Sequence, residues 1–420
     1  MQRVHIVGAG ISGLACAVRL SSEGHDVILY EGAGHAGGRC RSYHDDHLDC
    51  TIDNGNHLLL SGNTGVQEYL ALIDAEAELT GPDRAVFPFV DLAFNLKWTV
   101  EIDDSWWPGW ILDRNRRIPG TGIWDYFKSA RLMIASEKDV LQDVIDTDTN
   151  LFRRFIEPLT VGVLNTPAES GSAALLAKVI RKTFIRGARA CRPRIARHGL
   201  SQTFVDPALR YLEYRDARFE PNRRLRNITT VGQRAVALAF ADGEQTIDAG
   251  DMVVLALPAQ AVGTLLPAID PPSEFHPIVN AHFRVDDPPE VPEQAGLIGI
   301  VGGTAQWVFF RDNIISVTVS AADELAQQSN ESIANAIWRD LRAAICGLPK
   351  EPPYRHRVIK ERRATFSQTP RSIRHRAQCR CGFDNIFLAG DWVDTGFPAT
   401  IEGSIRSGFE AARVIAAVNS

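Results

Sequence analysis

Three glycines near the start of the chain are spaced to hold the phosphates of a dinucleotide. Gly8, Gly10 and Gly13 form a Gly-x-Gly-x-x-Gly pattern, and Glu31 follows about 20 residues later. In such a turn the first glycine permits a tight bend, the second lets the backbone approach a pyrophosphate, and the third lets a helix close on the preceding strand. We expect Ser12 to contact the same phosphates, and Glu31 to accept hydrogen bonds from ribose hydroxyls.

The elements that must position this turn surround it in the expected order. Residues 4–7 form a short apolar run typical of a buried parallel strand, and residues 14–20 carry an apolar helical pattern. Gly24 lies where the helix should end, and residues 27–30 form a second strand that leads into Glu31. A Gly-rich turn that arose by chance would not be flanked by a strand, a helix and a second strand in this order, so we predict a dinucleotide-binding βαβ unit.

A second motif follows at residues 37–42, which read GGRCRS. The combined pattern E-x5-G-G-R-x-x-S resembles the extended flavin signature of monoamine oxidases, protoporphyrinogen oxidases and phytoene desaturases. A plain NAD dehydrogenase has no use for Gly-Gly-Arg at this place, so the resemblance implies that the cofactor is FAD. It also implies that this motif and the segment after it line the diphosphate and reach toward the flavin, through Gly38, Arg39, Asn54, Gly55 and Asn56.

The other half of a flavin site is predicted near the end of the chain. Residues 385–392 resemble a buried strand that ends in Gly390 and Asp391, and a helix follows. This resembles the second flavin motif of the same superfamily, in which the Asp holds the ribityl chain or phosphate. Residues 395–408 come next, and Thr400 and Ile401 among them are expected to contact the cofactor. The helix that then carries Phe409 to Ile415 would direct its positive end at the flavin pyrimidine. Between the two halves, Leu225 lies in a predicted strand whose backbone would bracket the adenine.

The fold class predicted from these motifs is α/β, with a Rossmann-like FAD-binding domain and an interleaved α+β substrate domain. We assign residues 1–80, 200–270 and 361–420 to the discontinuous FAD-binding domain. Residues 81–199 and 271–360 are assigned to a substrate-binding, membrane-facing domain. Three separate domains in series would leave the two half-sites at opposite ends of the chain unexplained.

Composition limits the kind of partner and the compartment. The 420 residues suit two or three packing units, and the formal charge of −6 argues against nucleic acid as a main partner. The seven cysteines have neither zinc spacing nor C-x-x-C pairs, so we expect reduced thiols and no metal. Nothing like a secretory signal, with its apolar region and small-residue cleavage site, precedes the Gly-rich turn, and no apolar run reaches the ~20 residues that span a bilayer. We therefore expect a cytoplasmic protein, either soluble or attached to the inner face of the membrane.

Three further segments narrow the family resemblance. Thr400 stands where amine oxidases carry an aromatic wall residue before Met-Glu-Gly, which favours the carotenoid and squalene branch. Residues 53–60 (DNGNHLLL), 197–208 (RHGLSQTFVDPA) and 305–311 (AQWVFFR) resemble the hydroxysqualene dehydroxylases of hopanoid biosynthesis. This resemblance, which covers nearly the full chain, implies that reduced flavin transfers a hydride to the allylic carbon of hydroxysqualene while the hydroxyl leaves as water.

Such a reaction needs a proton donor and a source of electrons. His57 is our candidate for the general acid because imidazole titrates near neutral pH, with Asp53 and Asp394 as lesser candidates. The alternative is that His57 simply hydrogen-bonds to the cofactor or the backbone. No second Gly-x-Gly-x-x-Gly unit is present, so the electrons are expected from an external donor that the sequence does not identify.

Other functions remain open at this stage. A polyprene desaturase of the phytoene type would run the hydride in the opposite direction, and a flavin amine oxidase would act on amines. A non-catalytic carrier of isoprenoid lipids shares the fold, although the two intact half-sites argue against it.

Contact with a membrane is predicted from two clusters. Trp106, Trp107 and Trp110 precede several arginines, and residues 181–197 form a basic run with interleaved apolar residues. Core packing is the alternative explanation for the tryptophans, and a solvated helix face is the alternative for the basic run. We expect a peripheral contact in addition to the isoprenoid substrate.

Overall fold

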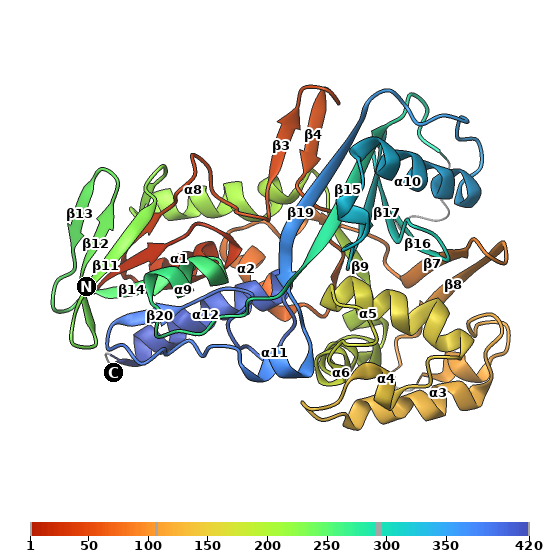
Figure 1. The fold of residues 1–420 in the computed structure, drawn as a ribbon, viewed down its shortest axis with the longest axis horizontal. Coiled ribbons are helices and arrows are strands. Elements are labelled where there is room, and N and C mark those ends of the chain that lie inside the picture. The colour runs from red at the N-terminus through yellow and green to blue at the C-terminus, as the bar shows by residue number, and fades with distance from the viewer. Residues whose placement is uncertain (1, 106–107, 290–295, 419–420) are drawn as a thin grey trace.

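The computed structural model describes residues 2–105, 108–289 and 296–418. Two sheets organise this part of the chain, and they lie at opposite ends of the molecule in Figure 1. The first is a parallel sheet whose apolar strands are buried on both faces. Its strands, in spatial order, are β10 (Arg218–Glu220), β2 (Asp26–Tyr30), β1 (Arg3–Val7), β14 (Met252–Leu255) and β20 (Ile386–Leu388).

Two helices from opposite ends of the chain cover one face of the parallel sheet. They are α1 (Ile11–Ser22) and α12 (Ile401–Val418), and they pack directly on each other. A Cβ on Gly408 would lie 2.2 Å from the carbonyl oxygen of Ser12, so this close approach requires glycine. The terminal helix is therefore part of the same core as the first βαβ unit.

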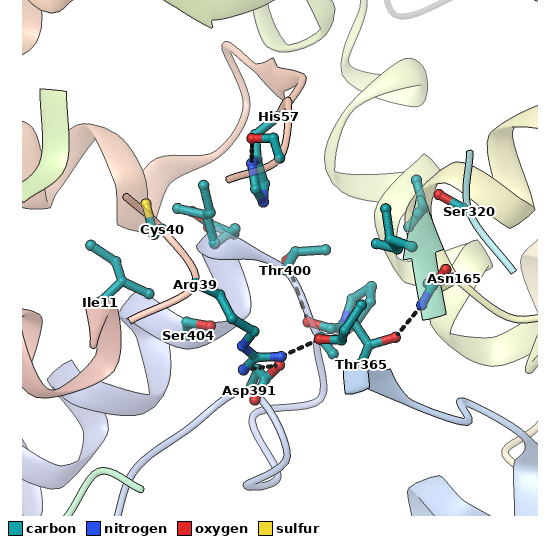
Figure 2. A pocket seen from close by; sticks show the side chains of 18 of the residues that line it. Ile11, Arg39, Cys40, His57, Asn165, Ser320, Thr365, Asp391, Thr400 and Ser404 are labelled. Atoms are coloured by element: carbon teal, nitrogen blue, oxygen red, sulfur yellow. Dashed lines mark hydrogen bonds and ion pairs between the residues drawn. The ribbon is translucent and has the colours of Figure 1, made fainter. Parts of the chain in front are cut away.

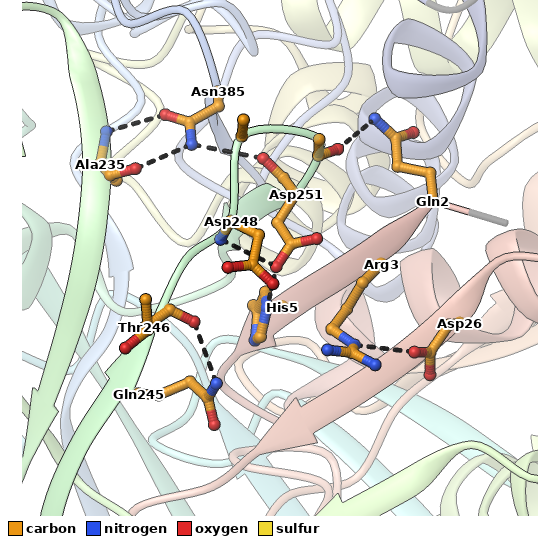
Figure 3. Close-up of polar contacts among 12 residues, drawn as sticks. Gln2, Arg3, His5, Asp26, Ala235, Gln245, Thr246, Asp248, Asp251 and Asn385 are labelled. Carbon is orange, nitrogen blue, oxygen red and sulfur yellow. Dashed lines mark hydrogen bonds and ion pairs between the residues drawn. The ribbon is translucent and has the colours of Figure 1, made fainter.

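A small antiparallel sheet covers the opposite face. It consists of β11 (Leu225–Val231), β12 (Arg234–Phe240) and β13 (Gly243–Thr246). Buried polar groups connect it to the parallel sheet (Figure 3): the Asn385 amide accepts from Ala235 N at 2.8 Å and donates to Asp251 O at 3.3 Å. The His5 ring bridges the Asp251 carboxylate and the Tyr30 hydroxyl, at 3.2 and 3.0 Å.

The second sheet is antiparallel except where β16 pairs with β7. Helix α10 (Asn330–Ala344) packs on one face, and a helical layer packs on the other. The order of strands is β19 (His356–Phe366), β15 (Phe275–Arg284), β18 (Ile314–Val319), β17 (Trp307–Arg311), β16 (Leu297–Val301), β7 (Ala85–Asp91) and β8 (Leu96–Ile102). The helical layer, at the lower right of Figure 1, contains α3 (Ile123–Ser129), α4 (Leu141–Val144), α5 (Glu157–Leu164) and α6 (Ala173–Lys182).

Short elements complete the described chain. The strands are β3 (Ser42–Asp45), β4 (Cys50–Asp53), β5 (Leu59–Leu60), β6 (Leu79–Thr80) and β9 (Pro193–Ala196). The helices are α2 (Thr64–Leu72), α7 (Ala188–Cys191), α8 (Asp206–Tyr214), α9 (Ala259–Leu265) and α11 (Pro370–Arg374). The 3-10 and π turns are η1 (Glu76–Glu78), η2 (Gly109–Leu112), η3 (Ala130–Ile134), η4 (Phe152–Ile156), η5 (Phe184–Arg186), η6 (Ser201–Val205) and η7 (Leu325–Gln327).

The predicted fold class is confirmed: a Rossmann-like parallel sheet is interleaved with a separate α+β unit. The parallel strands all come from the segments that we assigned to the cofactor, and the strands of the larger sheet come from the two insertions. One strand departs from that division, because β19 continues past residue 360 to Phe366 while it pairs with β15. Within residues 2–105, 108–289 and 296–418, no helix is long and apolar enough to cross a membrane.

Candidate functional site

A cavity of about 680 Å3 extends from the Gly-rich turn into the larger sheet and its helical layer. Segments from both ends of the chain line it: the β1–α1 turn, residues 37–40 and 54–63, and residues 390–404. Fourteen of the sixteen predicted site residues lie along its wall, and Gly13 and Leu225 do not. The fourteen are Gly8, Gly10, Ser12, Glu31, Gly38, Arg39, Asn54, Gly55, Asn56, His57, Gly390, Asp391, Thr400 and Ile401.

The three glycines of the first turn differ in what surrounds them. Gly8 has φ of +105°, and a Cβ there would lie 2.3 Å from the carbonyl oxygen of Ala256. A Cβ on Gly13 would lie 1.9 Å from the carbonyl oxygen of Gly8, so Gly13 serves helix–strand packing and not the cavity wall. Gly10 faces open space and precedes α1, whose first N–H groups have no partner within the helix. A phosphate group fits this place.

Glu31 lies at the cavity wall with its carboxylate already oriented. It accepts hydrogen bonds from Ala9 N at 2.9 Å and from Ala33 N at 2.8 Å. Each carboxylate oxygen retains a further lone pair, so the side chain can still accept from ribose hydroxyls. Leu225, by contrast, is 8% exposed and packs in the core between the small sheet and the parallel sheet. Its side chain does not reach the cavity, and the predicted contact of the strand's backbone with adenine stays a prediction.

The two predicted half-sites meet at Arg39 and Asp391. Figure 2 shows their side chains together at one edge of the cavity, where Arg39 Nη2 donates to Asp391 Oδ2 at 2.8 Å. The guanidinium also donates to the carbonyl oxygen of Ala364 on β19. Asp391 raises the pKa of Arg39, and Glu361 on the same strand adds to this effect. The sequence did not identify Glu361, which lines the cavity as well.

Helix α12 presents its N-terminus to the cavity. The Thr400 hydroxyl accepts from Gly403 N at 3.1 Å, and Thr400 O accepts from Ser404 N at 2.8 Å. The Glu402 carboxylate, which also borders the cavity, is held by Gly65 N and Val66 N at the start of α2 and is paired with Arg406. The positive end of the helix faces the cavity, which suits the partial negative charge of a flavin carbonyl.

A connected group of amides and a hydroxyl lies beyond the flavin motifs. Asn56 Nδ2 donates to Thr318 Oγ1 at 3.1 Å, and Thr318 Oγ1 donates to Asn280 Oδ1 at 2.7 Å. Asn280 Nδ2 donates in turn to Asn54 O at 3.3 Å. Asn280 and Thr318 are buried, and all four residues line the cavity. We call Asn56, Thr318 and Asn280 the amide–hydroxyl triad.

The triad was not predicted because β15 and β18 bring its members together only after folding. A second polar side chain on the cavity wall, Asn165, differs from the triad because it is already fully used. It donates to Thr365 Oγ1 and His276 O, and accepts from Ala321 N. Figure 2 shows the contact between Asn165 and Thr365 at the right side of the cavity.

His57 projects into the cavity from the segment after β4, and Figure 2 shows its ring pointing toward the middle of the space. Its Nδ1 lies 3.0 Å from the carbonyl oxygen of Gly55, so an Nδ1–H donor leaves Nε2 as an acceptor. Burial lowers the pKa of His57, against a smaller opposing effect of the contact with Gly55. The neutral ring is therefore the form at neutral pH, which does not favour the predicted role as a protonated general acid.

The two lesser acid candidates lie outside the cavity. Asp53 forms an ion pair with Arg311 at 2.8 Å, and it also accepts from Ser42 Oγ and Leu200 N. Asp394 accepts from Gln378 Nε2 and Gly396 N, and it does not line the cavity either. Both carboxylates are thus engaged by neighbouring groups, and Asp53 borders a separate cavity of about 30 Å3 that Asn56 and His57 also line.

The remaining part of the cavity is an apolar arm that reaches into the larger sheet and the helical layer. The sequence motifs did not reveal it, because its residues come from buried strands and helices that look like ordinary core. The side chains that line it include Phe87, Phe89, Phe155, Leu159, Val179, Phe184, Trp307 and Phe309. Its lining suits a hydrocarbon chain.

Another part of the cavity wall carries aromatic residues but not an open cage for an amine. Trp392 and Phe397 line the cavity, and Trp392 Nε1 donates to Leu257 O at 3.0 Å. The Phe397 ring already lies against two cations, with Lys178 Nζ and the Arg406 guanidinium 4.9 and 4.3 Å from its centre. A third cation would meet repulsion there.

These residues together fit a flavin dinucleotide. Gly10 and the start of α1 would hold the phosphates and Glu31 the ribose, and Arg39 pairs with Asp391 where the two ends of the chain meet. A family model described as flavin containing amine oxidoreductase matches residues 11–416. The chain belongs to this family of FAD-dependent oxidoreductases.

Comparison with individual proteins narrows the family further. The chain is 42% identical over 412 residues to a hydroxysqualene dehydroxylase of Sinorhizobium fredii, covering 98% of this chain and 97% of the relative. It is 43% identical over 417 residues to that of Rhodopseudomonas palustris, covering 99% and 98%. The resemblance to the hydroxysqualene dehydroxylase family is thus confirmed, and the chain is a member of that family.

Solved structures support the fold. A putative protoporphyrinogen oxidase from Exiguobacterium sp. superimposes with a TM-score of 0.71 at 18% identity, covering 99% of this chain and 98% of that one. A triple mutant of putrescine oxidase gives a TM-score of 0.72 at 18% identity, covering 99% of both chains.

Proposed function

We propose that this protein catalyses the FAD-dependent reductive dehydroxylation of hydroxysqualene to squalene in hopanoid biosynthesis. The observation that carries the proposal is the 41–43% identity, over nearly the full chain, to three proteins named hydroxysqualene dehydroxylase. The cavity supports it, because the residues that fit a flavin and the aromatic and aliphatic side chains of the apolar arm line the same space, together with the amide–hydroxyl triad.

The reaction replaces a hydroxyl by hydrogen and releases water. Bound FAD in its reduced form supplies the hydride, and one proton must reach the departing oxygen. The apolar arm binds the hydrocarbon and excludes water that would otherwise trap a cationic carbon. The amide–hydroxyl triad would orient the substrate hydroxyl. His57, which follows Asn56 of the triad in the sequence, offers Nε2 as a further hydrogen-bond acceptor in the cavity.

Two details extend beyond the family assignment. We propose that electrons reach the flavin from an external donor, because the only dinucleotide turn with flanking strands and helix in the sequence is the one at Gly8 to Gly13. We also propose that the protein works at the inner face of the cytoplasmic membrane, where a long-chain isoprenoid alcohol would partition.

The other functions are less well supported. Thr400 in place of an aromatic wall, and the two cations on Phe397, argue against an amine substrate. The complete flavin cradle argues against a carrier without redox activity. A polyprene desaturase would use the same cavity, and only the direction of hydride transfer separates it from a dehydroxylase.

The test is anaerobic incubation of the photoreduced protein with hydroxysqualene, followed by the visible flavin absorbance and product extraction. We expect reoxidation of the flavin with formation of one squalene per flavin. A flavin that stays reduced in the presence of hydroxysqualene contradicts the proposal, and reduction of oxidised flavin by a polyprene would support a desaturase instead.

A further inference from the structure

The helix α3 and the η3 turn that continues it expose a stripe of apolar and basic side chains. Trp124, Phe127, Lys128, Arg131 and Ile134 are all exposed, with 72% of Trp124 and 83% of Ile134 accessible. They are three or four residues apart, so they lie on one side of the helix, while Leu132 is buried on the other. The Trp124 and Phe127 rings lie 5.7 Å apart. We call these five residues the α3 surface.

The other large exposed apolar side chains do not form such a stripe. Tyr214 ends α8 and Val231 ends β11, on elements of the cofactor-binding unit. Single exposed apolar residues are common and need no explanation. An ordered row with two large aromatic side chains on one short helix lowers solubility unless a membrane or another protein covers it.

The charge around the α3 surface is positive, although the whole chain has a charge of −6. Residues 109–148 and 178–189 together contain eleven Lys and Arg against seven Asp and Glu, and all five charged residues of 178–189 are basic. The two segments lie together in the structure, because α6 packs on η3 and Arg181 donates from Nη1 to Met133 O at 2.9 Å. Exposed Arg186 and the half-exposed apolar Ile185 follow directly after α6. Basic residues with exposed aromatic and aliphatic side chains are the composition of interfacial membrane anchors.

The apolar arm of the cavity reaches the same region. Val179, Lys182, Thr183 and Phe184 line the cavity, and Lys182 is exposed. The end of α6 therefore belongs both to the cavity wall and to the helical layer that carries the α3 surface. Figure 1 shows α3, α4 and α6 together at one edge of the molecule, on the far side of the larger sheet from α10.

We propose that the α3 surface docks on an anionic lipid bilayer, and that the substrate leaves this bilayer and enters the apolar arm beside the C-terminal end of α6. Trp124, Phe127 and Ile134 insert among the lipids, and Lys128, Arg131 and the basic end of α6 contact the headgroups. The docking half depends only on the surface. The delivery half rests on the isoprenoid substrate of the proposed function.

This surface differs from the one expected from the sequence. Trp106 and Trp107 lie outside the described residues. Trp110 is buried at 7% exposure and packs edge-on against Tyr126 at 5.6 Å, so its predicted interfacial role is wrong. Of the basic run at 181–197, the residues at its start, Arg181 to Arg186, belong to the proposed surface, because Arg181 contacts η3.

Docking is tested by sedimentation of the FAD-loaded protein with vesicles of phosphatidylcholine alone or with 30% phosphatidylglycerol, a composition of roughly the charge of a bacterial inner leaflet. We expect binding to the anionic vesicles at low salt that weakens at high salt. The triple variant Trp124→Ser, Phe127→Ser, Ile134→Ser and the double variant Lys128→Gln, Arg131→Gln should each bind at least about tenfold more weakly. The matched control Tyr214→Ser, Val231→Ser removes two exposed apolar side chains elsewhere and should bind like the unaltered protein.

Delivery is tested by comparing turnover of hydroxysqualene held in vesicles with turnover of the same substrate in detergent micelles. The triple variant should lose most of its activity on vesicles and keep it in micelles, with unchanged flavin absorbance and melting temperature. Unaltered protein that stays in the supernatant with anionic vesicles, or a triple variant that sediments like the control, overturns the docking proposal. Vesicle binding without turnover in either medium would refute the proposed function and leave docking intact.

Discussion

The guanidinium of Arg39 and the carboxylate of Asp391 lie 2.8 Å apart, although 352 residues separate them in the sequence. Arg39 follows the Gly-Gly pair of the first flavin motif, and Asp391 ends the strand of the second. Their ion pair can form only when β20 has joined the parallel sheet beside β14. The cofactor site is therefore completed by the last part of the chain, and each half depends on the other.

Removing the charge of Arg39 should weaken FAD binding. Arg39→Gln leaves Asp391, which is 8% exposed, without its cationic partner next to a negatively charged diphosphate. The loss of a charge-assisted hydrogen bond predicts about a tenfold higher Kd for FAD, measured by titration of the apoprotein with flavin fluorescence. Arg413→Gln breaks an exposed ion pair with Glu410 and is the matched control. Equal FAD affinity of both variants would show that the Arg39–Asp391 pair does not support the cofactor.

The amide–hydroxyl triad should be needed for catalysis and not for the flavin. Thr318→Val keeps the shape of the side chain but removes the hydroxyl that connects Asn56 and Asn280. We expect kcat/KM for hydroxysqualene to fall roughly 10–100-fold, as for the loss of one or two oriented hydrogen bonds, with the flavin spectrum unchanged. Thr318→Ser retains the hydroxyl and should restore most of the activity. A Thr318→Val protein with normal kinetics would exclude the triad from substrate orientation.

The pH dependence of turnover should reveal how His57 acts. Its pKa is lowered by burial, so the ring is neutral at pH 7 and becomes protonated only as the pH falls below its ordinary value of about 6.5. If neutral Nε2 accepts a hydrogen bond from substrate, kcat should decline on acidification, and His57→Ala should be slower at pH 7, bind FAD normally and lack that acidic decline. Activity that instead increases on acidification would mean that the protonated ring is the active form. An unchanged His57→Ala profile would make Glu361, another ionisable side chain on the cavity wall, the next candidate to test.

The sequence predicted the parts of the site that depend on local patterns. The glycine spacing, the flanking strands and the position of Glu31 all lie within 31 residues, and the Gly390–Ile401 segment is equally compact. In each case the backbone requirement of a tight turn or a helix start restricts the residue type, so the residue type indicates the structure.

The remaining features depend on contacts between distant segments. Asn280 and Thr318 face each other because β15 pairs with β18, and neither strand carries a motif. Trp110 is buried and packs against Tyr126, whereas Trp124, for which the sequence predicted no role, is exposed. Composition alone could not distinguish a buried tryptophan from a surface one.

Acid should destabilise the fold through His282. This side chain is 1% exposed, its Nδ1 contacts Ser316 Oγ at 2.8 Å, and Nε2 has no partner among the described residues. Burial lowers the pKa of His282 to about 4, so its contribution to stability is complete above pH 6.5, where the unfolded chain is also neutral, and is lost as the pH falls toward 4. The loss amounts to at most roughly 3 kcal/mol.

Urea unfolding between pH 7 and 4 tests this directly. His282→Gln should flatten the decline in the free energy of unfolding over that range, even if the variant is less stable at pH 7. His44→Gln is the matched control, because the His44 side chain is 56% exposed. The same slope in His282→Gln as in the unaltered protein would assign the acid sensitivity to other groups, such as buried His5, whose pKa is also lowered by burial.

A single methyl group at Gly408 should disturb both the fold and the cofactor site. A Cβ there would lie 2.2 Å from Ser12 O and 2.9 Å from Cys16 N, and both are backbone atoms of α1 that cannot rotate away. Gly408→Ala must therefore push α12 from α1, which we expect to cost roughly 1–3 kcal/mol of unfolding free energy and to weaken FAD binding because both helix starts face the cofactor. Gly250→Ala, with nothing within 4 Å of the added Cβ, should be neutral in both measurements. Thermal unfolding with and without FAD separates the two effects, since a variant that is destabilised equally in both states has lost packing but not affinity.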